Sequence, residues 1–262
     1  MGKTVLLVVA CAAATLLGGC AGQNAAEPTP DAAQVNAATT ARTTVVVYRG
    51  PASCDGCSEA AAAWIRKVVP KFSVVYAGPA EKEKVTAALL GKAVLYVQPG
   101  GDTSVGKADK LLGPVAKTAI VSYVRSGGKY LGICQGAYLA GQNPGMGMLS
   151  PADTGQYIVS KGATTKSEAD TLVPLMYRGR KVSAYFQDGP YITGHTKNMV
   201  VVARYTNGLS AAVVKSFGLG KVGVVGTHPE APVSWYREAG LSTSARAGNQ
   251  ELGNDVLAKV LS

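Results

Sequence analysis

The chain has 262 residues, of which 47% are hydrophobic and only 16% are charged. This composition excludes an intrinsically disordered protein, because it supplies enough apolar surface for a packed core. The net charge of +10 comes from lysines and arginines scattered along the chain. Without a clustered, aromatic-interleaved basic stripe, we do not expect nucleic acid as a partner. A basic surface beside anionic lipids or wall polymers is the favoured interpretation.

The amino-terminal residues are typical of an export signal that is removed. Lys3 gives a positive region, and the apolar run that follows it is shorter than the ~20 residues that span a bilayer. Leu17-Gly18-Gly19-Cys20 resembles a bacterial lipobox, whose cysteine accepts diacylglycerol and becomes the mature amino terminus. We therefore expect residues 1–19 to be a lipoprotein signal peptide, with lipidated, palmitate-bearing Cys20 on the extracytoplasmic face of the cell membrane. An ordinary secretory signal is the alternative.

Two further segments follow this signal. Residues 20–41 are mostly Ala, Pro, Thr, Asn and Gln, so they cannot bury enough apolar surface to fold and are predicted to form a flexible tether. Residues 42–262 are sufficient for one well-packed domain, and they contain no internal repeat or second linker.

Short apolar strands alternate with helices in the first part of this domain. The pattern predicts strands at residues 43–48, 72–76, 93–97 and 130–133, and helices at 58–69, 81–90, 114–126 and directly after Cys134. Such alternation predicts an α/β fold with a parallel sheet and helices on both faces. After about residue 145, runs at 182–186, 199–205 and 211–215 predict added antiparallel hairpins, before a return strand at 223–226 and a last helix at 251–261.

The strongest chemical signal is Gly132-Ile133-Cys134-Gln135-Gly136, between a predicted strand and a helix. A nucleophile there would lie on a tight turn whose crowding the flanking glycines relieve. The helix amino terminus would favour a thiolate at Cys134. A buried structural cysteine is the alternative.

A second signal, His228-Pro229-Glu230, follows the return strand. A thiol nucleophile needs a base, and the base needs a group that orients it. We expect His228 to be that base and Glu230 to hold its ring. The other histidine, His195, stands in a polar loop and is predicted to be a surface residue.

Two glycines, Gly100 and Gly101, follow the third predicted strand. Their backbone N–H groups and that of Gln135 are candidates for an oxyanion hole. A plain turn is the alternative.

Cys54 and Cys57 form a C-x-x-C pair, and Cys134 is the odd cysteine of the domain. In an oxidising compartment we expect the pair to form a structural disulfide, with a thioredoxin-type redox motif as the alternative. A metal site is not expected, because no second ligand pair exists. With strand order 2-1-3-4, the first and fourth strands lie roughly 10 Å apart, so Cys57 and Cys134 can share one cleft.

These motifs together resemble class I glutamine amidotransferases, and more closely the amino-terminal domain family of biotin–protein ligase. The segments that carry the resemblance are Tyr48-Arg49-Gly50-Pro51, Gln98-Pro99-Gly100-Gly101-Asp102, residues 127–138 and Gly226-Thr227-His228-Pro229-Glu230. The resemblance implies a flavodoxin-like sheet and a triad of Cys134, His228 and Glu230. Biotin ligation is not expected, because residues 42–262 leave no room for a ligase catalytic domain.

One residue departs from the motif of class I glutamine amidotransferases. Glutaminases of this class usually carry Gln in the G-x-C-x-G-x-Q motif where this chain has Tyr138, so glutaminase activity is not expected. Three functions stay open: a Cys-dependent hydrolase or transferase acting on an amide or ester in the cell envelope, a non-catalytic ligand-binding module, and an exported thiol–disulfide protein. The expected partner is a small-molecule or envelope-derived ligand, and no cofactor is expected. The sequence leaves the oligomeric state open.

Overall fold

The structure is a computed structural model that describes residues 42–262. The predicted signal peptide, the lipidation site Cys20 and the tether lie outside the described residues. Within residues 42–262, no helix has the length and apolar character needed to cross a membrane.

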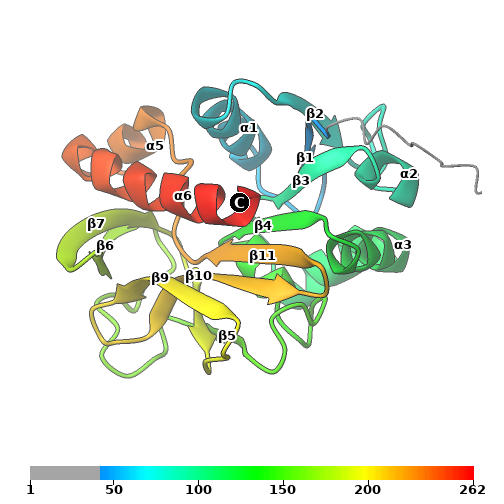
Figure 1. The fold of residues 1–262 in the computed structure, drawn as a ribbon. Coiled ribbons are helices and arrows are strands. Elements are labelled where there is room, and N and C mark those ends of the chain that lie inside the picture. The colour runs from blue at the N-terminus through cyan, green and yellow to red at the C-terminus, as the bar shows by residue number, and fades with distance from the viewer. Residues whose placement is uncertain (1–41) are drawn as a thin grey trace, which may run out of the picture. The chain divides into compact units, whose positions relative to one another are not determined.

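The core of the fold is one eleven-stranded sheet (Figure 1). Five neighbouring strands are parallel, in the spatial order β2-β1-β3-β4-β11. Their bounds are β1 Thr44–Tyr48, β2 Ser73–Ala77, β3 Ala93–Gln98, β4 Lys129–Ile133 and β11 Gly220–Val225. This parallel half confirms the predicted α/β fold and the 2-1-3-4 order.

Antiparallel strands extend the sheet beyond β11 in the order β10-β9-β6-β7. Short β5 and β8 pair with each other, and β8 also pairs with β10. The bounds are β5 Asp153–Gln156, β6 Thr171–Tyr177, β7 Arg180–Phe186, β8 Pro190–Thr193, β9 Met199–Tyr205 and β10 Ser210–Phe217. The predicted hairpin region is therefore confirmed.

Helices cover both faces of the sheet (Figure 1). Helices α1 (Cys57–Val68) and α6 (Arg246–Leu261) pack on one face, and α2 (Ala87–Leu90) and α3 (Val105–Arg125) pack on the other. Alternate residues of β1 belong to opposite cores, Val45 and Val47 to the first and Val46 and Tyr48 to the second. Burial on both faces explains the continuous apolar strand sequences. Two short helices, α4 (Gln135–Leu139) and α5 (Val233–Glu238), follow β4 and β11.

Three predicted helices differ in length from the structure. The last helix, expected at residues 251–261, begins earlier, at Arg246. The helix expected at residues 81–90 begins only at Ala87, because Arg49 holds the Glu81 carboxylate in the preceding loop and the Thr86 side chain caps the helix at the Leu89 N–H. The helix expected at residues 114–126 is the second half of α3. Its first half begins after the Ser104 cap and is broken at Gly113, where φ is 77°.

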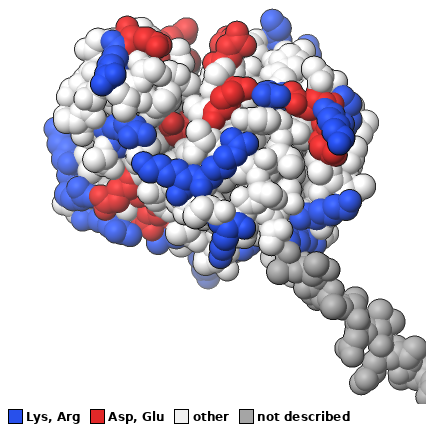
Figure 2. All heavy atoms as spheres, turned by 90° about the horizontal axis from the view of Figure 1, so that it is seen from above, with Lys and Arg blue, Asp and Glu red and all other residues white. Residues whose placement is uncertain are grey.

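Charged side chains are mixed on the surface. On the face drawn in Figure 2, lysine and arginine side chains form several groups separated by Asp and Glu. This arrangement agrees with the scattered basic residues of the sequence and gives no continuous basic stripe on that face.

Candidate active site

Cys134 occupies the tight connection between β4 and α4. Its backbone has φ 49° and ψ −108°, a region that non-glycine residues rarely adopt. The neighbouring glycines are required by close backbone approach: a Cβ on Gly132 would lie 2.4 Å from the Gly136 carbonyl oxygen, and one on Gly136 would lie 2.1 Å from the Gln98 carbonyl oxygen. Helix α4 has only five residues, so its dipole is small.

The Cys134 side chain is almost completely buried, at 5% exposure. Its backbone N–H donates to the Val225 carbonyl at 2.9 Å, which fixes the turn against β11. Its sulfur donates to the Gln187 carbonyl oxygen at 3.3 Å. The thiol is therefore held by the end of β11 on one side and by the connection between β7 and β8 on another.

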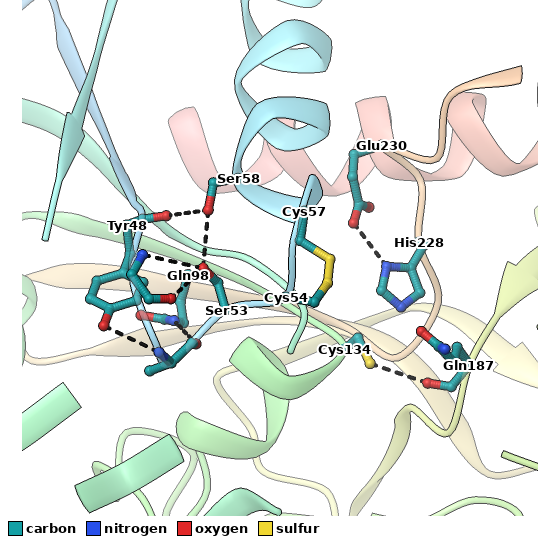
Figure 3. The surroundings of a disulfide bond; sticks show 12 residues. Tyr48, Ser53, Cys54, Cys57, Ser58, Gln98, Cys134, Gln187, His228 and Glu230 are labelled. Carbon is teal, nitrogen blue, oxygen red and sulfur yellow. Dashed lines mark hydrogen bonds and ion pairs between the residues drawn. A yellow bond between two sulfur atoms is a disulfide. The ribbon is translucent and has the colours of Figure 1, made fainter. Parts of the chain in front are cut away.

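His228 and Glu230 form a buried pair directly after β11. The distance from His228 Nδ1 to Glu230 Oε1 is 2.8 Å, and the two side chains are 2% and 0% exposed. Within the described chain, His228 Nε2 has no hydrogen-bond partner. In Figure 3 the ring lies between the Glu230 carboxylate and the Cys134 side chain. Glu230 thus orients the ring and leaves Nε2 available on the side of the sulfur.

The surroundings of His228 set its protonation. Burial lowers the pKa of His228, but the Glu230 carboxylate and the Cys134 sulfur raise it more, so the pKa lies above its usual range. The backbone of His228 is fixed by its N–H bond to Tyr185 and by the Asn249 amide at its carbonyl. The ring also packs edge-on against Tyr185 and Trp235.

The two glycines after β3 lie against these side chains. A Cβ on Gly100 would lie 2.7 Å from His228 Cε1, and one on Gly101 would lie 1.8 Å from Gln135 Oε1. The backbone N–H groups of Gly101 and Gln135 have no acceptor within residues 42–262. Two N–H donors are therefore available next to the elbow that carries Cys134.

Cys54 and Cys57 are joined by a disulfide bond, as their spacing predicts, and Cys134 is the free cysteine among residues 42–262. The disulfide lies close to the His228 ring in Figure 3. A Cβ on Gly100 would lie 3.5 Å from Cys57 Sγ, so this sulfur faces Gly100. Neither cysteine of the pair lines the cavity at Cys134. The cleft expected to hold both Cys57 and Cys134 therefore holds Cys134 alone.

A cavity of about 590 Å³ opens in front of Cys134. Residues from five parts of the chain line it: Gly101, Asp102, Thr103, Ser104, Val105, Cys134, Gln135, Tyr138, Gln156, Glu168, Gln187 and Asp188. Sequence reasoning missed the last four polar residues of this lining, because they lie in or beside the hairpin region. One signal was present, since Gln187-Asp188-Gly189-Pro190 is a polar turn sequence directly after a predicted strand. His195 is exposed, as predicted, and does not line the cavity.

The first part of the chain, which carries the elbow and the glycine loop, resembles a known family. Residues 43–146 match the family described as biotin-protein ligase, N terminal. The resemblance predicted from sequence is thereby confirmed. The biotin-protein ligase match covers Gly100, Gly101, Cys134 and Gln135, whereas His228 lies outside it. Among curated proteins, no sequence matches this chain.

Solved glutamine amidotransferases share the fold. A structure described as PurLQS from Thermotoga maritima is 20% identical, with a TM-score of 0.57 over 84% of this chain and 98% of that chain. A glutamine amidotransferase from Thermotoga maritima is 14% identical, with a TM-score of 0.56 over 84% of this chain and 99% of the other. A further glutamine amidotransferase is 17% identical, with a TM-score of 0.53 over 76% of this chain and 100% of the other. At these identities the comparison establishes the flavodoxin-like, amidotransferase-like fold alone.

Proposed function

We propose that residues 42–262 form a Cys-dependent hydrolase or transferase that acts on an amide or ester, with Cys134 as nucleophile, His228 as base and Glu230 as the residue that orients the base. The observation that carries this proposal is the buried His228–Glu230 contact of 2.8 Å, with the free Nε2 on the side of a cysteine at a strained strand-to-helix turn. A nucleophile, a base and an orienting acid in this order form the standard arrangement of acyl-transfer sites.

In the proposed reaction, the Cys134 thiol loses its proton to His228 Nε2 and the sulfur attacks the substrate carbonyl carbon. The carbonyl oxygen becomes an oxyanion, which the N–H groups of Gly101 and Gln135 stabilise. Donors of this kind contribute about 2.7–4 kcal/mol each in acyl-transfer sites. His228 then returns the proton to the leaving amine or alcohol, and the carbonyl reforms as a thioester on Cys134. Water or an acceptor amine attacks the thioester and regenerates the thiol, which completes hydrolysis or transfer.

Glu230 supports these steps because it accepts a hydrogen bond from Nδ1–H and stabilises the imidazolium. Its side chain is fully buried, so little solvent competes for this contact. The raised pKa of His228 fits this role, since a protonated ring beside the sulfur favours the ion pair of imidazolium and thiolate.

A second candidate is a binding module that keeps the fold without turnover. It is favoured by the bond from the Cys134 sulfur to the Gln187 carbonyl, because a thiol that donates to a carbonyl serves as a packed structural group. Tyr138, where glutaminases of this class usually carry Gln, fits this candidate as well.

We also propose that the protein works in the cell envelope, anchored through acylated Cys20. Support comes from the lipobox-like Leu17-Gly18-Gly19-Cys20 sequence and from the disulfide between Cys54 and Cys57, which suits an oxidising compartment.

The test of the catalytic proposal uses 4-nitrophenyl acetate, a small activated ester. We expect a burst of one equivalent of nitrophenol and an acetyl group on Cys134 in the intact mass. Cys134→Ala abolishes the burst, His228→Ala slows it, and His195→Ala is the matched control that keeps it. A wild-type chain that releases nitrophenol no faster than Cys134→Ala overturns the proposal and favours the binding module.

A further inference from the structure

The cavity at Cys134 differs in charge from the rest of the protein. The chain carries 26 lysines and arginines against 16 aspartates and glutamates. The cavity lining nevertheless contains three carboxylates, Asp102, Glu168 and Asp188, and no lysine or arginine. The charged residues around the candidate nucleophile are therefore all acidic, although the protein as a whole is basic.

Two of these carboxylates, Glu168 and Asp188, lie in or beside the hairpin region. Glu168 precedes β6 and Asp188 follows β7, so both lie outside residues 43–146, the part that matches the biotin-protein ligase family. Two of the three carboxylates therefore come from the hairpin region, whereas Asp102 lies within the matched family segment.

Asp188 is held in place as an acceptor. Gln156 Nε2 donates to its two carboxylate oxygens, at 3.0 and 2.8 Å. Burial raises the pKa of Asp188, the Gln156 hydrogen bond lowers it, and the nearby Glu168 charge raises it again, with a net rise. Its backbone has φ 46°, a strained conformation that aspartate tolerates better than most residues. A half-buried carboxylate near a second negative charge gains from a cationic partner.

A second observation also points to a ligand that donates hydrogen bonds. Gln135 lines the cavity and is only 3% exposed, yet its Oε1 has no partner within the described residues. Its amide nitrogen donates to the Thr103 carbonyl, which fixes Oε1 as the free end of the amide. The Tyr138 hydroxyl also lacks a partner among residues 42–262. The Asp188 and Cys134 charges both raise the pKa of Tyr138, after burial, which has the largest effect, so both groups lie near this side chain.

We infer that the cavity binds the acyl part of a cationic substrate, an amide or ester with a free ammonium group a few bonds from the reactive carbonyl. The ammonium group donates to Asp188 and to Gln135 Oε1, and Glu168 adds long-range attraction. The cavity offers no cationic side chain to a free carboxylate, so the substrate is a net cation such as an aminoacyl amide, and a zwitterionic amino acid is excluded. This inference rests on the proposed function, because it places the carbonyl at Cys134.

The test measures how fast Cys134 reacts with methanethiosulfonates that differ only in charge. In each reaction the thiolate sulfur attacks the reagent sulfur, a mixed disulfide forms and methanesulfinate leaves. The probes are the 2-aminoethyl (cationic), methyl (neutral) and 2-sulfonatoethyl (anionic) reagents. Each rate is divided by the rate of the same reagent with 2-mercaptoethanol. We expect the cation to react with Cys134 about tenfold or more faster than the anion, the factor that ~1.4 kcal/mol produces.

Variants separate this inference from the catalytic proposal. Asp188→Asn, which suits the same backbone, and Glu168→Gln reduce the cation-to-anion ratio. Glu251→Gln removes an exposed carboxylate outside the cavity, paired with Arg178 and Arg180 on the surface, and leaves the ratio unchanged. A wild-type ratio near one, or a ratio that Asp188→Asn does not reduce, overturns the cationic site. If instead His228→Ala leaves all three rates unchanged while the ratio stays high, the catalytic proposal fails and the cationic site stands.

Discussion

Replacing Glu230 by Gln tests how much the buried carboxylate contributes to the His228 pair. The glutamine oxygen can still accept a hydrogen bond from Nδ1–H, so the variant removes the charge and keeps the shape. Both side chains are inaccessible to solvent, at 2% and 0% exposure, and the contact is 2.8 Å. A hydrogen bond to a charged group contributes about 1.5–3 kcal/mol to stability. Because the glutamine keeps a neutral hydrogen bond, which contributes about 0.5–1.5 kcal/mol, we expect Glu230→Gln to lower the free energy of unfolding by the difference, about 1–1.5 kcal/mol, where His228 is protonated.

The loss of stability in Glu230→Gln depends on pH, and the direction of this dependence follows from the raised pKa of His228. A group whose pKa is higher in the folded state adds stability that is fully present below its unfolded pKa, near ~6.5 for histidine, and is lost as the pH rises through the folded pKa. The difference between wild type and Glu230→Gln is therefore largest below pH ~6.5 and shrinks above it.

Urea unfolding from pH 5.5 to 9 measures this difference, and NMR of the histidine ring protons locates its source. The chain has only two histidines, so His228 and the exposed His195 give separable signals. In Glu230→Gln the pKa of His228 falls, while the signal of His195 is unchanged. A stability difference that is the same at every pH would refute the reasoning, because it would show that the contact does not depend on the charge of the ring.

Three further predictions concern other parts of the chain. Without reductant, alkylation and peptide mapping of residues 42–262 find one free thiol, that of Cys134, and three free thiols would contradict the disulfide. Gly100→Ala forces the His228 ring to move, because the new Cβ would lie 2.7 Å from Cε1. We expect slower ester cleavage and a loss of about 1–3 kcal/mol in the free energy of unfolding. Gly106→Ala, with open space around its Cβ, is the control and keeps the activity. In the full-length chain, Cys20→Ser releases the protein from the membrane fraction or blocks its processing, whereas an unmodified amino terminus elsewhere in the wild type would remove the lipid anchor.

The parallel half of the fold was predictable because its signals are local. Each strand from β1 to β4 is a short apolar run, buried on both faces, and a turn or helix signal follows it. The first half of α3 was missed because Gly106 and Gly113 weaken the helical pattern, and only the structure reveals the Ser104 cap. Strand β6 was missed because Pro174 lies within it and argues against a strand that pairs on both sides.

Part of the candidate site was predictable from the sequence, for the same reason. Cys134, His228 and Glu230 lie in motifs that follow strands, and parallel strands bring their carboxyl ends to one edge of the sheet. Gln156, Glu168 and Asp188 come from connections among antiparallel strands, whose pairing partners are distant in the chain. No local pattern specifies that β7 ends against Cys134, so the acidic part of the cavity required the structure.

The pH profile of Cys134 alkylation by iodoacetamide tests the central claim most directly. A free cysteine titrates near ~8.5. If His228 activates Cys134, alkylation persists well below pH 7 and maps to Cys134, the midpoint moves upward in His228→Ala, and His195→Ala leaves it unchanged. A profile centred near pH ~8.5 that is indifferent to His228→Ala would contradict the claim, because the elbow would then be an architectural feature without an activated nucleophile.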